Sequence, residues 1–299
     1  MKKPTGIFPP MFTIWDNNEC YDKKASENYI TWLIDNGIES IVPCGSTGEN
    51  TAMMPDEQID VIKHVVSFVN GQIPVYAGTG KYSTQETLKI SSGAKEAGAD
   101  GLLVILPYYF KPYKQAAMDH IRNIHKEIGL PILLYNNPHF AGYEFTAQEA
   151  RLLKDEGVLI GVKAAHGDAN RVSDMRYYCG KDFLIFYGHD YAALPGIAAG
   201  ANGWLSGFPS TFPKQCRKLQ DAILADNDLD KARKIWDKFI PFVHAFMDPD
   251  VNAHVHWLEI LKWCVCEQGV NAGIPRRPLK ELDSEYKKIF KKPLEILLG

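Results

Sequence analysis

Eight short apolar runs alternate with amphipathic segments along residues 1–212 of the chain. Such nearly continuous apolar runs are typical of parallel strands that are covered on both faces. Strict alternation of strands and helices indicates parallel βα units, and eight units favour a closed (β/α)₈ TIM barrel over an open sheet. The eight predicted strands are residues 6–9, 39–43, 74–77, 101–106, 131–135, 159–163, 183–187 and 203–206.

The segments between the runs carry helix signals. Tyr29 and Leu33 share one face of a predicted helix, and Thr146 with Glu149 has the spacing of a capping box, as does Ser83 with Glu86. The alternation stops near residue 212, and the remainder predicts helices at 214–225, 229–246, 255–268 and 279–289. We therefore expect a barrel over residues 1–212 and a C-terminal helical extension over residues 213–299 that packs on it.

Composition and charge exclude several classes of protein. The chain has 33 basic and 36 acidic residues, a formal net charge of −3, and no basic run with interleaved aromatics, so no nucleic-acid partner is expected. No apolar stretch is long enough for a membrane span, and Pro4, Pro9 and Pro10 interrupt the N-terminus, so neither an anchor nor a signal peptide is expected.

Cysteine and histidine spacings argue against a metal or redox centre. The six cysteines fit no zinc pattern and no C-x-x-C motif, which predicts reduced thiols in a cytoplasmic protein. The nine histidines show no paired-ligand spacing, and no complete glycine-rich cofactor loop follows a strand. We expect a site with no metal and no cofactor.

Lys163 is the sharpest chemical feature, because it ends an apolar strand at the edge where barrel enzymes carry their catalytic groups. Desolvation there disfavours the ammonium, and a neutral amine can attack a carbonyl to form an imine. A lone lysine at a strand end more often extends to solvent. Tyr135 ends the preceding strand, where its hydroxyl could relay protons, although a tyrosine in this position often only packs in the core.

The second predicted strand, residues 39–43, leads into the turn Gly45-Ser-Thr-Gly48, which is followed by Glu49. Its exposed N–H groups and the hydroxyls of Ser46 and Thr47 suit a carboxylate, although many βα turns carry such residues only as caps. Glu49 is interpreted as an acid in the first turn of the next helix and is given no catalytic role. A lysine, a tyrosine and a hydroxyl turn at strand ends together favour imine chemistry on a 2-oxo acid.

These motifs resemble those of the dihydrodipicolinate synthase / N-acetylneuraminate lyase family, whose members are class I Schiff-base enzymes. The resemblance covers nearly the whole chain at the spacing of the family. It is carried by Gly6-Ile-Phe-Pro-Pro10, Gly45-Ser-Thr-Gly-Glu49, Ala77-Gly-Thr-Gly80, Pro107-Tyr-Tyr109, Tyr135-Asn-Asn-Pro138, Lys163 and Arg277-Pro-Leu279.

The resemblance implies roles for individual residues. Lys163 corresponds to the Schiff-base lysine and Tyr135 to the proton-relay tyrosine. Ser46 and Thr47 correspond to the pair that holds the carboxylate of the 2-oxo acid, with pyruvate as the expected substrate. Tyr109 corresponds to a tyrosine that many members lend across a subunit contact.

The resemblance also implies neighbours of the imine and an assembly. Leu205 corresponds to a residue whose backbone carbonyl lies near the imine. Gly188 and Asp190 fall where sialate lyases bind their polyol chain, although Tyr191 stands where those lyases usually carry an acid. Family members are usually homotetramers, built as dimers of dimers, so a homotetramer is expected.

Phe140 departs from the family pattern. Dihydrodipicolinate synthases carry an arginine there, which binds the carboxylate of the second substrate. A benzyl group cannot replace a guanidinium in that task, so we expect a relative that is not a true dihydrodipicolinate synthase. Arg171 is a possible substitute clamp, but a solvated arginine at a helix start is the preferred interpretation. His166 is a candidate pocket residue, as is His139, although a surface loop is the more ordinary position for His166.

Three hypotheses remain open. The first is a lyase or aldolase that makes or consumes a pyruvate-type 2-oxo acid through a Lys163 imine. The second is a sibling dehydratase or deaminase that acts on 2-keto-3-deoxy sugar acids or hydroxypyrroline carboxylate. The third is a non-catalytic paralogue that binds a small ligand, which the intact set of Lys163, Tyr135, Ser46 and Thr47 argues against.

Overall fold

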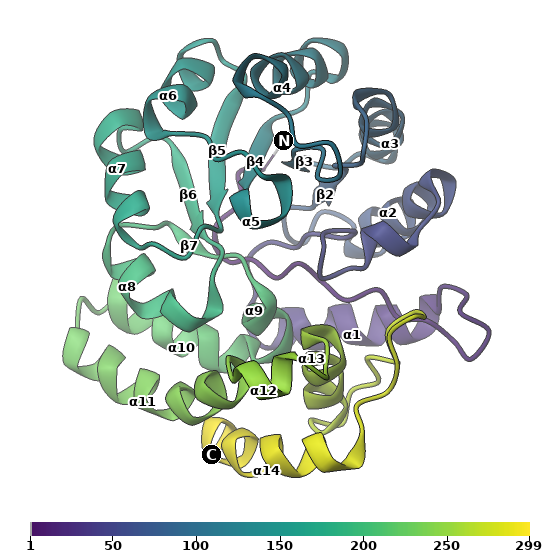
Figure 1. The fold of residues 1–299 in the computed structure, drawn as a ribbon, viewed down its shortest axis with the longest axis vertical. Helices are drawn as coiled ribbons and strands as arrows, with labels where there is room; N and C mark the ends of the chain where they lie inside the picture. Colours follow the sequence, from purple (N-terminus) through teal and green to yellow (C-terminus); the bar gives the residue numbers. More distant parts are fainter. Residues whose placement is uncertain (1) are drawn as a thin grey trace.

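A computed structural model of the protein describes residues 2–299 and shows a ring of parallel strands surrounded by helices (Figure 1). Seven strands form one sheet in the order β1-β7-β6-β5-β4-β3-β2, and every pair of neighbours is parallel. The chain therefore has the predicted TIM-barrel fold. The strands are β1 Gly6–Ile7, β2 Tyr76–Gly78, β3 Gly101–Ile105, β4 Ile132–Asn136, β5 Leu159–Ala164, β6 Leu184–Tyr187 and β7 Gly203–Trp204.

The predicted strand at residues 39–43 lies between β1 and β2 as expected, but only as two isolated bridges, Pro10 with Val42 and Ile41 with Val75. Val42 N donates to Pro9 O and Tyr76 N donates to Ile41 O, at 2.9 and 3.0 Å. These bonds join the two edge strands of the sheet. The pairing stays short because prolines on both sides of the segment have no N–H to donate.

Within residues 2–299, eight helices follow strands or strand-like segments around the barrel, three more are short, and three form the C-terminal part (Figure 1). Around the barrel lie α1 Lys23–Asp35, α2 Pro55–Val69, α3 Thr84–Ala97, α4 Lys114–Ile128, α6 Ala147–Asp155, α7 Asn170–Cys179, α8 Ala193–Ala198 and α10 Pro213–Leu224. The short helices are α5 Pro138–Ala141, α9 Gly207–Thr211 and α12 Pro249–Asn252. The C-terminal helices are α11 Leu229–Phe246, α13 Trp257–Cys266 and α14 Ser284–Leu298.

The predicted caps and helix faces explain where the helices begin and what they bury. Thr146 and Glu149 form the reciprocal capping box at the start of α6. The Ser83 hydroxyl accepts the Glu86 N–H at the start of α3, and its side chain also meets the Glu86 carboxylate at 3.2 Å. Tyr29 is fully buried, as the helical spacing predicts.

The C-terminal helices differ from their predicted bounds in two places. The helix expected at 255–268 begins at Trp257, after His256 as its N-cap. The helix expected at 279–289 begins only at Ser284, because residues before it are held in place by Lys280 N, which donates to Glu259 Oε1 at 3.0 Å. It then continues to Leu298, which buries Leu294 and Leu297.

The C-terminal segment covers one side of the barrel (Figure 1). Helix α10 contacts β1 and β7, while α14 packs along α11 and α13 packs against α9. The division of the chain at residue 212 stays a prediction. Over residues 2–299, none of the helices combines the length and the apolar character that crossing a membrane requires.

Candidate active site

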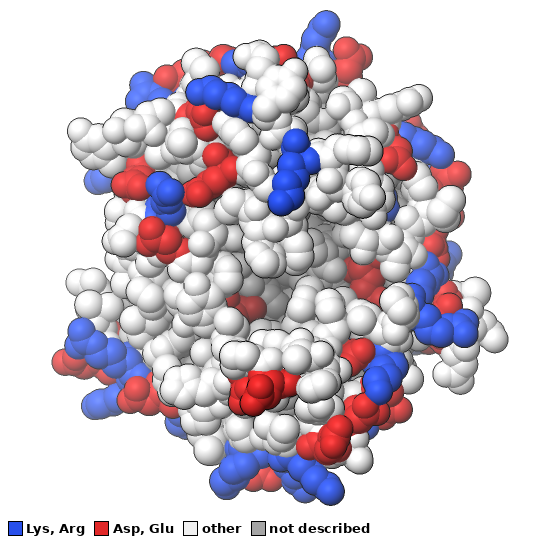
Figure 2. Space-filling model, in the orientation of Figure 1, with Lys and Arg blue, Asp and Glu red and all other residues white. Residues whose placement is uncertain are grey.

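A cavity of about 770 Å³ lies at the carboxyl ends of the strands. Figure 2 shows a hollow in the centre of this face, with walls that are mostly uncharged and some acidic atoms within it. This end of a barrel is where catalytic groups are expected. The cavity is lined by the following predicted site residues: Ser46, Thr47, Tyr135, Phe140, Lys163, His166, Gly188 and Asp190.

Lys163 and Tyr135 lie side by side because β5 and β4 pair in a register that places their Cα atoms opposite each other. Both side chains are buried, and Lys163 Nζ lies 3.9 Å from the centroid of the Tyr135 ring. Within residues 2–299, no carboxylate lies within 4.0 Å of this nitrogen. The amine therefore faces the ring of Tyr135 and the open cavity.

Gly188 leaves room for the lysine stem. A Cβ atom at position 188 would lie 3.0 Å from Lys163 Cγ and 2.9 Å from Ala165 Cβ, which is too close for an ordinary contact. The absence of a side chain at Gly188 therefore lets Lys163 extend along the cavity floor. Any larger residue there would displace the lysine.

The turn that carries Ser46 and Thr47 is held in an unusual backbone conformation. Cys44 and Glu49, which flank the turn, both have φ of 57°, in the left-handed region that non-glycine residues rarely adopt. A Cβ at Gly48 would lie 3.0 Å from Cys44 N and 3.0 Å from Met11 O, so a side chain there would press on the backbone of the turn. The conformation presents the Ser46 and Thr47 side chains to the cavity.

Glu49 does not occupy the first turn of a helix, and this part of the sequence interpretation is wrong. Its carboxylate is buried and forms an ion pair with Lys262 of α13, with 2.7 Å between Oε1 and Nζ. The partner lies far along the sequence, so the local pattern after a βα turn gave no sign of the pair.

Asp190 lines the cavity, but its carboxylate is largely engaged within the protein. It accepts hydrogen bonds from Trp204 Nε1 at 3.2 Å, Ser206 Oγ at 2.9 Å, and the N–H groups of Gly207 and Phe208 at 3.1 Å. Burial raises the pKa of Asp190 to about 6, and these hydrogen bonds together with the Lys163 charge oppose that rise. Asp190 therefore ties the loop after β6 to the start of α9.

Four histidines, His139, His166, His189 and His256, line the same cavity. Both ring nitrogens of His166 are buried without a hydrogen-bond partner in the described part of the chain. Burial lowers the pKa of His166 to about 4. Burial also lowers the pKa of His189, and the nearby charge of Lys163 lowers it further. The lowered pKa values favour the neutral imidazole at His166 and His189, and each such ring can donate one hydrogen bond and accept another.

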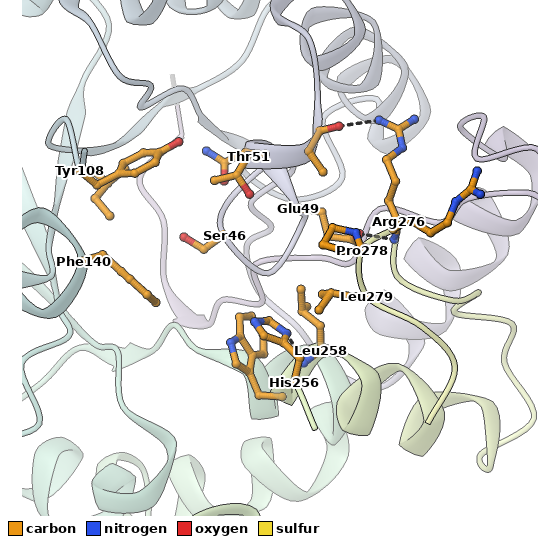
Figure 3. A pocket seen from close by; sticks show the side chains of 15 residues that line it. Ser46, Glu49, Thr51, Tyr108, Phe140, His256, Leu258, Arg276, Pro278 and Leu279 are labelled. Atoms are coloured by element: carbon orange, nitrogen blue, oxygen red, sulfur yellow. Dashed lines mark hydrogen bonds between the residues drawn. The ribbon is translucent and has the colours of Figure 1, made fainter. Parts of the chain in front are cut away.

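Phe140 stands between this cavity and a second one of about 330 Å³, which includes Glu49, Tyr108, Arg276 and Leu279 in its lining. Figure 3 shows Phe140 and Tyr108 on one side of the second cavity and His256 with Leu258 on another. The Phe140 side chain is 47% exposed, so its ring is free to meet a ligand at the mouth.

Three other predicted residues lie away from the cavity lining. Tyr109 is 75% exposed and packs edge-on against Phe110. Leu205 is fully buried beside the lining residue Ser206. Arg171 Nε pairs with Glu144 at 3.0 Å, and a second nitrogen lies 3.7 Å from Asp174, which engages its guanidinium outside the cavity.

The C-terminal helices supply a wall that the sequence did not predict. His256 and Trp257 line both cavities, and Met247, Asn252 and Val255 line the larger one. These residues follow no strand, so a search of strand ends could not find them. In residues 2–299, no group of three or more His, Cys, Asp or Glu side chains is placed to hold a metal ion.

Comparison with known proteins identifies relatives that match nearly the whole chain. The sequence profile of the dihydrodipicolinate synthetase family matches residues 3–297. A 4-hydroxy-tetrahydrodipicolinate synthase of Bartonella henselae is 34% identical over 291 residues, which cover 97% of this chain and 96% of that protein.

Solved structures show the same relationship. A dihydrodipicolinate synthase superimposes with a TM-score of 0.88 at 32% identity, over 98% of this chain and 99% of the other. A prophage protein of the dihydrodipicolinic acid synthase family from E. coli K12, solved in complex with pyruvate, gives a TM-score of 0.90 at 25% identity over 98% of each chain. The chain therefore belongs to the dihydrodipicolinate synthetase family, whose members are lyases of the aldolase type.

Proposed function

We propose that the enzyme forms an imine between Lys163 Nζ and the C2 carbonyl of a pyruvate-type 2-oxo acid. The observation that carries this proposal is the pairing of Lys163 with Tyr135 on the cavity floor, with 3.9 Å between the amine and the ring centroid. The family relative solved in complex with pyruvate supports the choice of substrate.

The remaining groups have roles that follow from this step. The neutral amine adds to C2, and the carbinolamine then loses its hydroxyl as water to give the imine. The Tyr135 hydroxyl supplies the proton for the departing hydroxyl. Ser46 and Thr47 bind the carboxylate by their hydroxyl and N–H groups.

We further propose that the second substrate is not a carboxylate-bearing aldehyde such as aspartate semialdehyde. Lys163 is the one lysine or arginine among the lining residues of the larger cavity within residues 2–299, and the imine consumes it. Phe140 offers no hydrogen-bond donor, and Arg171 is engaged by Glu144. A carboxylate brought to Phe140 in the larger cavity would lose water without gaining a cationic partner from the lining of that cavity.

A sibling dehydratase or deaminase, acting on a 2-keto-3-deoxy sugar acid or hydroxypyrroline carboxylate, is the second candidate. His166 favours it, because elimination of water or ammonia needs a proton donor near the leaving group and both nitrogens of His166 lack partners. A panel of these acids, tested by release of pyruvate, by release of ammonia and by a product mass lower by one water, separates cleavage from elimination. The binding-only hypothesis predicts no turnover with any acid.

Borohydride trapping with pyruvate, followed by peptide mass spectrometry, tests the imine directly. We expect a reduced adduct at Lys163 and its loss in Lys163→Arg, because a guanidinium cannot form this imine. Lys81 is the internal control. It is also buried, but its ammonium donates to the carbonyls of Asn50 and Met53, so no adduct is expected there. An adduct that persists in Lys163→Arg would refute the mechanism.

We propose a homotetramer, built as a dimer of dimers, in which Tyr109 enters a neighbouring subunit. The exposed aromatic side chains around Tyr109 support this assembly, as does the resemblance of the sequence to tetrameric family members.

We also propose a cytoplasmic location, on the basis of six cysteines that form no predicted disulfide or zinc pattern.

A further inference from the structure

A buried ion pair joins the Ser46–Thr47 turn to the C-terminal helices. We infer that Glu49 and Lys262 are positioning residues that hold this turn in the geometry that binds a substrate carboxylate. This inference rests on the proposed function, which gives the turn the carboxylate of a 2-oxo acid as its ligand.

The pair is almost completely removed from solvent. The side chain of Lys262 is 1% exposed and that of Glu49 is 3% exposed. Lys262 Nζ also donates to Thr13 O at 2.8 Å and to Ile274 O at 3.4 Å, so its ammonium is surrounded by oxygen atoms. Burial lowers the pKa of Lys262, and the Glu49 charge opposes that shift. A buried charge of this kind persists only with its partner in place.

The second oxygen of Glu49 is occupied as well. Glu49 Oε2 accepts from Trp15 Nε1 at 3.1 Å and from Arg276 N at 2.7 Å. Figure 3 shows the Arg276 main chain beside Glu49, on the side of the second cavity away from Phe140. One carboxylate therefore connects three segments of the chain that are distant in sequence. Neither Glu49 nor Lys262 lines the larger cavity, so neither reaches the reacting atoms.

The turn needs such an anchor because its backbone is strained. Left-handed non-glycine residues such as Cys44 and Glu49 persist where the surroundings over-determine them. Two further contacts fix the turn: Glu49 N donates to Ser46 O at 3.0 Å, and Thr13 Oγ1 donates to Gly48 O at 2.7 Å. Loss of the ion pair would leave the left-handed Glu49 without its main restraint, and Ser46 would shift with it.

Such a shift of Ser46 should weaken the binding of the 2-oxo acid more than it slows imine formation. The carboxylate of the 2-oxo acid does not react, so its contacts are the same before and during imine formation. Removing contacts of this kind raises the half-saturating substrate concentration and leaves the limiting rate unchanged. A purely structural role would lower stability without this selective change in pyruvate affinity.

Trapping of the Lys163 adduct over a range of pyruvate concentrations tests the inference. In Glu49→Gln we expect the half-saturating concentration to rise roughly 10-fold to 100-fold, the scale of a small misplacement of a binding group. We expect the rate of trapping at saturating pyruvate to stay within a factor of about three, because Lys163 and Tyr135 are untouched. An unchanged half-saturating concentration in folded Glu49→Gln overturns the inference.

The double variant Glu49→Gln, Lys262→Met keeps the test decisive if either single variant fails to fold. It removes both charges together, and neutral replacement of a buried pair is tolerated better than loss of one partner. If the pair acts as a unit, the double variant has the same raised half-saturating concentration as a folded single variant. If the two residues acted independently, the fold-increases of the two single variants would multiply in the double variant. Wild-type affinity in the folded double variant also overturns the inference.

Arg176→Leu is the matched control for lost stability. Its guanidinium donates five hydrogen bonds near the starts of β6 and β7, at the opposite end of the barrel. It should lower the melting temperature and leave the half-saturating pyruvate concentration unchanged. Equal losses of affinity in Arg176→Leu and Glu49→Gln would contradict positioning by the ion pair. Absence of any adduct in the wild type would instead overturn the proposed function, and this inference with it.

Discussion

The Tyr135 hydroxyl accepts a hydrogen bond from Asn137 Nδ2 at 3.1 Å, and Tyr135 lines the larger cavity. Because the amide uses only a lone pair of the phenol, the phenolic proton remains available for a partner in the cavity. The hydroxyl is thus held in position and still able to donate. This arrangement favours a relay of protons over simple packing.

Removing that hydroxyl should slow catalysis. We expect Tyr135→Phe to reduce kcat by roughly 10²-fold to 10⁴-fold, the usual effect of a positioned acid–base group, with a smaller change in pyruvate binding. Steady-state kinetics on the substrate found with the acid panel measures both quantities. Tyr143→Phe is a suitable control, because its hydroxyl donates to Glu149 outside the cavity lining. A kcat for Tyr135→Phe within a factor of about two of the wild type would show that the residue only packs.

Phe140 is the basis of a second prediction, which concerns the choice of the second substrate. Discrimination by an absent charged hydrogen bond can reach about 10⁴-fold, so we expect little or no condensation of pyruvate with aspartate semialdehyde. A coupled assay for the condensation product measures it. Efficient condensation would mean that another cation binds the carboxylate, and its loss in Arg171→Ala would identify Arg171, released from Glu144, as that cation.

The sequence predicted the positions of residues at strand ends but not of residues that depend on distant partners. Lys163 and Tyr135 line one cavity, as expected of residues that end neighbouring apolar strands of a barrel. Glu49 was misread because its partner, Lys262, comes from a helix near the other end of the chain. Trp257 was missed because no local pattern tells a helical residue that faces a cavity from one that faces the core.

At the scale of elements, α3 and α4 meet through a buried histidine. His120 on α4 is 5% exposed, and its Nδ1 lies 2.9 Å from the Thr84 hydroxyl at the start of α3. Its Nε2 is buried without a partner in the described structure, so a second proton there would have no acceptor. Burial accordingly lowers the pKa of His120 from 6.5 to about 4.

This histidine should make the protein less stable in acid. His120 takes up a proton near pH 6.5 in the unfolded chain but only near pH 4 in the folded protein. The contribution of neutral His120 to the free energy of unfolding is therefore complete above pH 6.5 and is lost as the pH falls toward 4. The loss reaches about 3 kcal/mol at the lower pH. Urea titrations at neutral pH and at pH 4 measure the free energy of unfolding. On going from neutral pH to pH 4, we expect the free energy of unfolding of His120→Leu to rise by that amount relative to wild type. Replacing the exposed His254 by leucine should produce no such difference, and an equal change in both variants would contradict the assignment.

Strand and helix positions were predicted well where periodicity decides them. The bounds of α11 agree with the predicted 229–246. Prediction was poorer where proline or tertiary contacts decide the structure, as at residues 39–43 and at the start of α14. The short helices α5, α9 and α12 were not predicted, because helices of four or five residues are too short to show an amphipathic period.

On the scale of the whole molecule, the aromatic residues around Tyr109 argue for assembly. Tyr109, Phe110 and Tyr113 are 75%, 78% and 74% exposed in the single chain. Large neighbouring aromatics with this exposure are typical of surfaces that bind another protein. A second copy of the chain would bury them.

Light scattering should therefore give a mass of at least twice the 33.6 kDa of one chain. We expect Tyr109→Ala to weaken the assembly and to lower activity in parallel. Tyr177→Ala, which removes an aromatic side chain that is 82% exposed on α7, should change neither. A strictly monomeric wild-type enzyme with full activity would contradict the proposed assembly.

The wall formed by the C-terminal helices has a consequence for biosynthesis. The ribosome completes Tyr135 and Lys163 long before His256, Trp257 and Lys262, which come from the last part of the chain. A nascent or truncated chain that ends before α13 would lack Lys262, His256 and Trp257, so the Glu49 carboxylate would have no cationic partner and one side of the cavity would be missing. The cavity is therefore enclosed only after the C-terminal helices have been synthesised and have packed on the barrel.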